Sequence, residues 1–129
     1  FDVPYCVRKA KQVADQKEPD LDTLDWGLHL ARLARTVRPD SPSAVLAEAR
    51  LRLRKGDRDA ALGLLEDLRE LPKGSGDDED AWYVGTRLLG DIYLDELRLP
   101  DNAIACYTDY REYGKSVADT LYRLGEAYE

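Results

Sequence analysis

Methionine is absent from this sequence, and histidine occurs only once among the 129 residues. No apolar run approaches the length of about 18 residues that a helix needs to cross a bilayer. No basic-then-apolar leader precedes Asp2 either. We therefore expect the chain to be a piece of a longer protein, and we expect this piece to make no membrane contact.

Positive charge is also scarce, because 19 Lys and Arg residues face 26 Asp and Glu residues, for a formal charge of −7. Duplex nucleic acids are bound mainly by cationic side chains that displace counterions. We therefore predict no nucleic-acid partner. The length suffices for one globular unit with a modest core, so we predict a single domain over residues 1–129.

The residues that usually carry chemistry are few and scattered. Cys6 and Cys106 form no metal-ligand spacing, and we expect two free thiols in a reducing compartment such as the cytoplasm. His29 follows Asp25 by one turn but has no nucleophile nearby. The acidic run 77–80 lacks the alternating spacing of a calcium loop. We predict no catalytic residue, no cofactor and no metal.

Val, Ile and Thr are few beside Leu and Ala, which favours helices over strands. Apolar residues recur at steps of three or four, and Pro, Gly and Asp clusters interrupt them at short intervals. The pattern predicts an all-α fold of seven helices, with a mobile loop at 72–80. The predicted helices cover residues 4–16, 22–37, 42–55, 58–71, 80–97, 100–113 and 116–129.

The second predicted helix is apolar on two stripes. One contains Leu24, Leu28, Ala31 and Ala34, and the outer one contains Trp26, Leu30, Leu33 and Val37. A helix with two apolar faces is expected to have packing neighbours on both sides.

A five-residue pattern occurs twice at the same point of a helical pair. Residues 89–93 read L-G-D-I-Y, and residues 124–128 read L-G-E-A-Y, 35 positions later. This period and the L-G-x-x-Y pattern resemble the tetratricopeptide repeat. The residues that match the pattern in the second helix of a pair are Ala103, Tyr107 and Tyr110 in one unit, and Ala61, Leu65 and Leu68, preceded by Ala49, in another.

The resemblance implies an α-solenoid of about three and a half repeats, in which stacked neighbours form the core. Its hairpins would span 4–39, 42–72 and 80–113, with the first helix of a fourth at 116–129. The unit 4–39 lacks the L-G-x-x-Y core, and Trp82 falls one turn too early for the family's conventional Trp. Small residues are expected to let paired helices approach closely, at Ala49, Gly90 and Gly125.

Proteins of this family expose the first helix of each pair on a concave surface, so the resemblance implies a non-catalytic scaffold that binds a protein or peptide segment. Arg50, Arg54 and Arg87 are expected to contact acidic groups of the partner. The full set that the resemblance implies for partner binding is Leu46, Arg50, Leu53, Arg54, Arg87, Asp91, Leu94, Tyr122 and Glu126, and the same register exposes Val84, Asp95 and Asp119. The Lys and Asn residues with which one subgroup clamps chaperone tails are missing from these places.

Two alternatives remain open. Arg50 and Asp91 can instead pair with each other between adjacent repeats, which contributes at most about 1 kcal/mol. The concave surface can also be filled by the rest of the same chain or by another copy, which would make this a structural or self-association module. An enzyme is the weakest class, because no nucleophile, base and orienting group come together.

Overall fold

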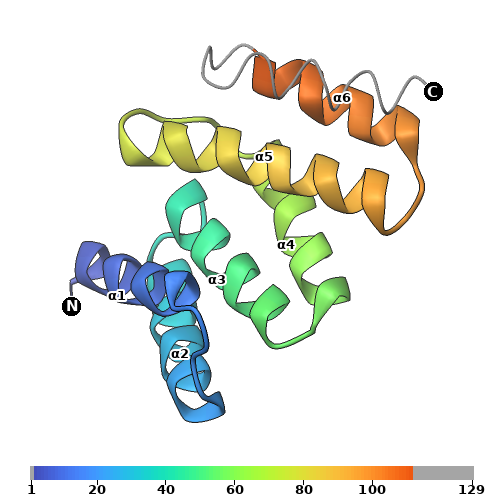
Figure 1. Ribbon diagram of the computed structural model, residues 1–129. Coiled ribbons are helices and arrows are strands. Elements are labelled where there is room, and N and C mark those ends of the chain that lie inside the picture. The colour runs from blue at the N-terminus through green and yellow to red at the C-terminus, as the bar shows by residue number, and fades with distance from the viewer. Residues whose placement is uncertain (1, 112–129) are drawn as a thin grey trace.

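The computed structural model describes residues 2–111, and every regular element in that range is an α-helix (Figure 1). The predicted all-α class is therefore confirmed for this part of the chain. The predicted seventh helix, with Asp119, Tyr122 and Glu126, lies outside the described residues. The helices are α1 Val3–Asp15, α2 Leu21–Val37, α3 Pro42–Arg54, α4 Arg58–Glu70, α5 Asp77–Asp95 and α6 Pro100–Arg111.

The first four helices each begin at a side chain that accepts a hydrogen bond from the backbone amide three residues later. These capping residues are Asp2, Asp20, Ser41 and Asp57. A cap of this kind satisfies one of the amides that the first helical turn leaves unbonded. Hydrogen bonds from Thr23, first from its side chain and then from its backbone, lower the pKa of Asp20.

The start of α5 differs from the prediction. The helix begins at Asp77, so the acidic run forms its first turn, and only the residues before it remain in the link after α4. Negative side chains are stabilised at the positive end of the helix dipole. Asp78 also accepts hydrogen bonds from Ser41 Oγ at 2.9 Å and from the amide of Ser43 at 3.2 Å, which attaches this turn to the start of α3.

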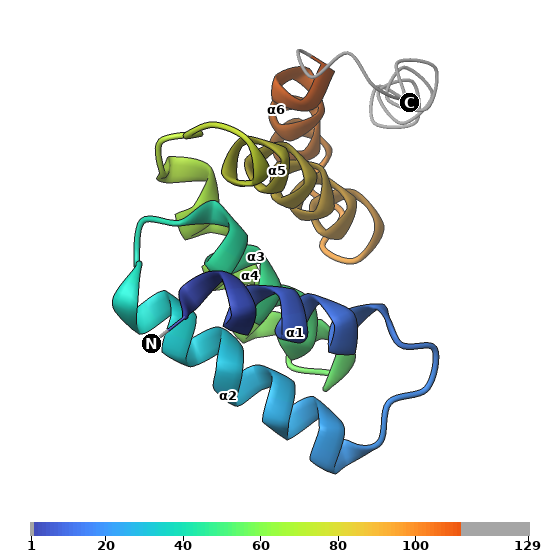
Figure 2. The same ribbon diagram turned by 90° about the vertical axis from the view of Figure 1, so that its left-hand side faces the viewer.

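Each helix packs against its neighbour in the chain, and α1, α3 and α5 also pack against one another in sequence. α3 is central in this arrangement, since it contacts α1, α2, α4 and α5 (Figures 1 and 2). One core cluster joins α1, α2 and α3, and a larger one joins α3, α4, α5 and α6. α3 contributes to both clusters, through Leu51 and Ala49 respectively.

The contact between α5 and α6 depends on a missing side chain. A Cβ atom placed on Gly90 would lie 2.8 Å from Tyr107 Cε1 and 3.1 Å from Cys106 Cβ. Tyr107 is 1% exposed, and its hydroxyl donates to Asp91 Oδ1 at 2.6 Å. Gly90 therefore provides the close approach that the sequence pattern predicts.

The outer stripe of α2 has packing neighbours along only part of its length. Leu28, on the other stripe, is buried against α1 and α3. Leu30 on the outer stripe is half-buried and packs against a cluster that includes residues of α1 and α3. Trp26 is 48% exposed and Val37 is 55% exposed, so within residues 2–111 the expectation of a packing neighbour is wrong at these two positions.

Candidate functional site

A groove of about 460 Å³ lies between α1, α3 and the first turns of α5. Val84 on α5 is 43% exposed, and Leu46 on α3 is half-buried. The apolar residues that line the groove are Val3, Pro4, Val7, Leu46, Ala47, Ala81 and Val84. Surfaces of this kind favour an apolar occupant, because burial releases about 25 cal/mol for each Å² of apolar surface removed from water.

The α1 end and the α5 end of the groove carry opposite charge. Arg8 and Lys11 on α1 contribute cations, and the first turn of α5 contributes Asp77, Asp78 and Asp80. Arg38, in the link after α2, lies near the α5 end, because its carbonyl accepts from the amide of Ser41, whose hydroxyl donates to Asp78. Among residues 2–111, the structure gives Arg8, Lys11 and Arg38 no ion pair. The groove is therefore bipolar, with a basic wall of Arg8 and Lys11 on α1 and an acidic end on α5.

Two of the residues expected to bind a partner, Leu46 and Arg50, line this groove together with Val84. The Arg50 guanidinium forms an ion pair with Asp15 at the end of α1. Asp91 accepts the hydroxyl of Tyr107 instead. The alternative in which Arg50 and Asp91 pair with each other is therefore wrong, because each has a different partner.

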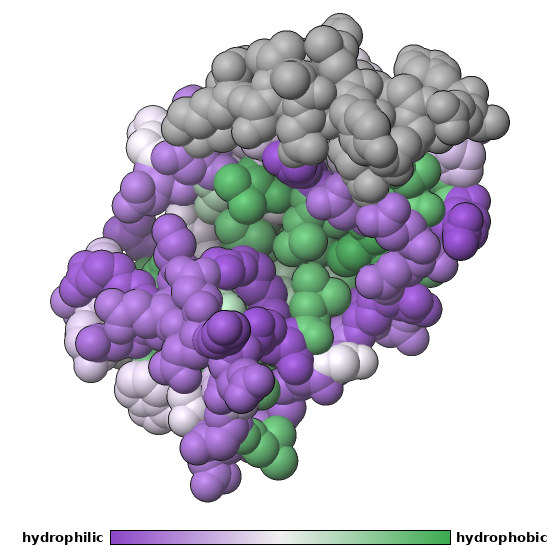
Figure 3. Space-filling view, in the orientation of Figure 1, coloured by the Kyte–Doolittle hydropathy of each residue, from purple (hydrophilic) through white to green (hydrophobic). Residues whose placement is uncertain are grey.

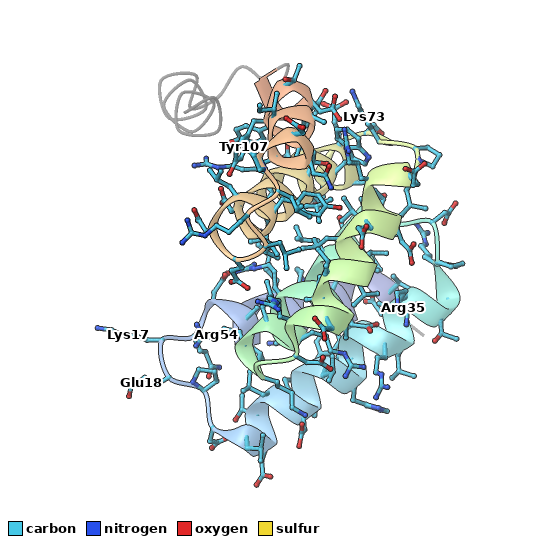
Figure 4. All side chains as sticks on the ribbon, turned by 90° about the vertical axis from the view of Figure 1, so that its right-hand side faces the viewer. Lys17, Glu18, Arg35, Arg54, Lys73 and Tyr107 are labelled. Carbon is cyan, nitrogen blue, oxygen red and sulfur yellow. The ribbon has the colours of Figure 1, made fainter. Side chains whose placement is uncertain are left out.

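Arg54 has a structural contact that the sequence does not predict. Its Nη2 donates to the carbonyl oxygens of Gln16 at 2.6 Å and Lys17 at 3.0 Å, in the link between α1 and α2 (Figure 4). These bonds connect the second helical pair to the loop of the first. Arg54 is thus placed beside that loop, away from the lining of the groove.

The remaining described residues of the predicted surface lie farther along α3 and α5. The Arg87 guanidinium lies over the ring of Tyr110, 5.3 Å from its centroid. Leu53 and Leu94 are half-buried and pack against the large core cluster. None of these three lines the groove. In the space-filling view, apolar side chains gather in the middle of this face within a hydrophilic surround (Figure 3).

The sequence pattern does not predict the contribution of α1 to the groove. The unit 4–39 lacks the L-G-x-x-Y core, so the repeat register assigns no exposed concave positions to α1. The signal was nevertheless present as the spacing of Pro4, Val7, Arg8 and Lys11, at steps of three and four, which places them on one helical face.

The other sites that the sequence raised have structural partners or are exposed. His29 is exposed on α2, and Asp25 is paired with Lys55 Nζ at 2.5 Å. The part of the chain from 2 to 111 holds no group of three side chains able to share a metal ion. No helix in that range is both long enough and apolar enough to cross a membrane.

The prediction of two free, buried cysteines is confirmed. Cys6 is 5% exposed, and Cys106 is fully buried. Burial is the main cause that raises the pKa of the Cys106 thiol to about 11, and the nearby Arg69 opposes it. A thiol with so high a pKa is a poor nucleophile near neutral pH.

Comparison with known proteins yields no match: no family model, no curated protein and no solved structure is similar to this chain.

Proposed function

We propose that the chain is a tetratricopeptide-like α-solenoid that serves as a non-catalytic scaffold, with a segment of a partner protein lying in the groove between α1, α3 and α5. The order of contacts supports the fold, since α1, α3 and α5 pack side by side while α2 and α4 lie behind them. The close approach of Tyr107 to Gly90 supports the repeat pattern at the pair α5 and α6.

The groove carries the functional part of the proposal. It combines an apolar floor, a basic wall and an acidic end, and most of the lining residues lie on α1, α3 and α5, which the repeat pattern assigns to the concave surface. An extended segment would bury the side chain of Val84, which is 43% exposed in the free protein. The charged walls would fix the orientation of the segment and exclude other partners.

The test is a display selection with a library of random peptides, followed by affinity measurements on two matched variants. Val84→Lys places a charge on the groove floor. Val37→Lys makes the same change on α2, where the native side chain is 55% exposed and outside the groove. We expect Val84→Lys to weaken the selected peptides about tenfold or more, equal to about 1.4 kcal/mol.

The Val37→Lys variant should bind the selected peptides with unchanged affinity. Equal effects of the two substitutions would place the binding surface elsewhere. If the wild type enriches no peptide, the proposed scaffold function fails.

One observation favours the alternative of a self-association module. On the outer stripe of α2, the side chains of Trp26 and Val37 are exposed, and a second copy is able to cover them. Sedimentation velocity distinguishes the two functions, because self-association through this stripe predicts a dimer that Val37→Lys dissociates and Val84→Lys does not.

A further inference from the structure

We propose that the groove selects a peptide segment of defined charge order, in which an acidic residue contacts Arg8 and Lys11 and the apolar residues that follow it lie on the floor around Val84. The inference rests on the proposed function and adds the chemistry of the partner. It also moves the predicted acidic contact from Arg50, Arg54 and Arg87 to the wall formed by α1.

The first argument is the imbalance of charge on the basic wall. The acid nearest along α1, Asp15, is already bound by Arg50. Arg8 and Lys11 therefore line the groove without an ion pair within residues 2–111. A carboxylate from a bound segment would supply an ion-pair partner, and charge-assisted hydrogen bonds to guanidinium groups are among the strongest in proteins.

The second argument is the acidic end, which sets the direction of the segment. Asp77 and Asp80 line the groove on α5, and the carboxylate of Asp78 is already bonded to the start of α3. An acidic residue placed at this end would be repelled, since the carboxylates outweigh the partial positive charge of one helix terminus. The bound segment is thus acidic at the α1 side only.

The third argument is the position of the apolar floor between the two charged ends. Val7 lies on α1, Leu46 on α3 and Val84 on α5. A segment that contacts both walls must pass over these side chains. We therefore expect apolar residues in the middle of the segment, where they replace water on the floor.

The experiment uses the peptides that the wild-type protein enriches from the random library and measures their affinity by fluorescence polarisation. In Arg8→Glu/Lys11→Glu, two cations of the basic wall are reversed. The control, Lys17→Glu/Arg32→Glu, makes the same change in net charge at exposed positions outside the groove. We expect the first double variant to lose at least about tenfold in affinity, and the control to lose less than about threefold.

Exchanging the charges of the peptide and the protein provides a second test. A selected peptide whose acidic residue is replaced by Lys should lose affinity for the wild type and regain it on Arg8→Glu/Lys11→Glu. Circular dichroism verifies that both double variants keep the wild-type helical signal. If charge reversal unfolds α1, the neutral pair Arg8→Gln/Lys11→Gln replaces it, with the same direction of effect expected.

Two failures are distinguishable. If the wild type enriches no peptide, the proposed function fails and this inference fails with it. If peptides are enriched but lack an acidic residue, or bind both double variants equally well, the inference is overturned while the scaffold function stands.

Discussion

Glu48 on α3 accepts a hydrogen bond from Arg35 Nε on α2 at 2.7 Å, although the side chain of Glu48 is only 3% exposed. Its second oxygen lies 3.8 Å from Arg52 Nε, one turn farther along α3. A carboxylate held out of water in this way depends on its cations, because an unpaired buried charge is costly. Glu48 therefore couples the packing of α2 to that of α3.

The substitution Glu48→Gln should lower the free energy of unfolding by about 1–3 kcal/mol, because it removes the negative charge and turns an amide N–H₂ toward two guanidinium groups. Urea unfolding followed by circular dichroism measures the change as a shift of the midpoint at constant slope. Glu70→Gln, at an exposed position of α4, is the control and should change stability by less than about 0.5 kcal/mol. Identical midpoints for the two variants would mean that the Arg35 contact contributes nothing.

Gly90→Ala and Gly63→Ala should shift stability in opposite directions. An added methyl group at Gly90 meets Tyr107 at 2.8 Å, which forces α5 and α6 apart and costs about 1–3 kcal/mol. A Cβ atom added to Gly63 on α4 would meet no other atom within 4 Å outside its chain neighbours and its own helical backbone. The same change should therefore stabilise the helix by about 0.4–1 kcal/mol. Thermal unfolding of both variants measures the two changes. A loss of stability at both positions would contradict the open space around Gly63.

The stability of the protein should fall as the pH rises through the alkaline range. Folding raises the pKa of Cys106 from its ordinary value of 9.0 to about 11. The native state therefore keeps a proton that the unfolded state releases, so this contribution is complete below about pH 9 and is lost between about pH 9 and pH 11. Tyr93, whose pKa is raised to about 12 mainly by burial, adds to the loss above about pH 10.

Urea midpoints at several pH values measure this slope. Cys106→Ala lowers stability at every pH, but its midpoints should fall less steeply between about pH 9 and pH 11 than those of the wild type. Parallel slopes for the two proteins would show that Cys106 titrates normally.

Arg54→Ala should loosen the link between α1 and α2. The side chain donates to the carbonyl oxygens of Gln16 and Lys17, so its removal leaves this link with fewer contacts. We expect faster trypsin cleavage after Lys17, with a change in melting temperature of a few degrees at most. Arg32→Ala, exposed on α2, serves as the control and should leave the cleavage rate unchanged.

Most of the helices were predictable because their ends are marked locally. Gly56, with φ of +83°, and the capping Asp57 separate α3 from α4 where the sequence indicates a turn. The start of α5 was not predictable in this way. The hydrogen bond from Ser41 Oγ to Asp78 joins residues 37 positions apart, and no local pattern reports such a contact.

Trp82 is a second residue whose contacts the sequence pattern does not predict. By the repeat pattern it falls one turn too early, yet it is buried with its ring edge-on to Tyr83 at 5.2 Å. Its Nε1 donates to the carbonyl oxygens of Arg69 at 3.3 Å and Leu71 at 3.1 Å, where α4 ends. The residue has a local structural role that a family pattern does not contain.

Of the nine residues that the sequence assigns to partner binding, Leu46 and Arg50 line the groove. The register of α3 placed Leu46 and Arg50 on the face that lines the groove, because helical spacing determines which positions share a face. The ion pair of Arg50 with Asp15 and the basic wall on α1 depend on how two helical pairs dock. That geometry is tertiary, so the helical spacing of α3 indicates which of its residues share a face but not which residues of α1 they contact.

The most direct test of the account is amide hydrogen exchange on the protein with and without a peptide selected by the wild type. The account predicts added protection in α1, in the first half of α3 and in the first turns of α5, which line the groove. It predicts unchanged exchange in α4 and along the outer stripe of α2. Protection confined to α2, α4 or α6, with none in α1, would contradict the assignment of the groove as the partner-binding surface.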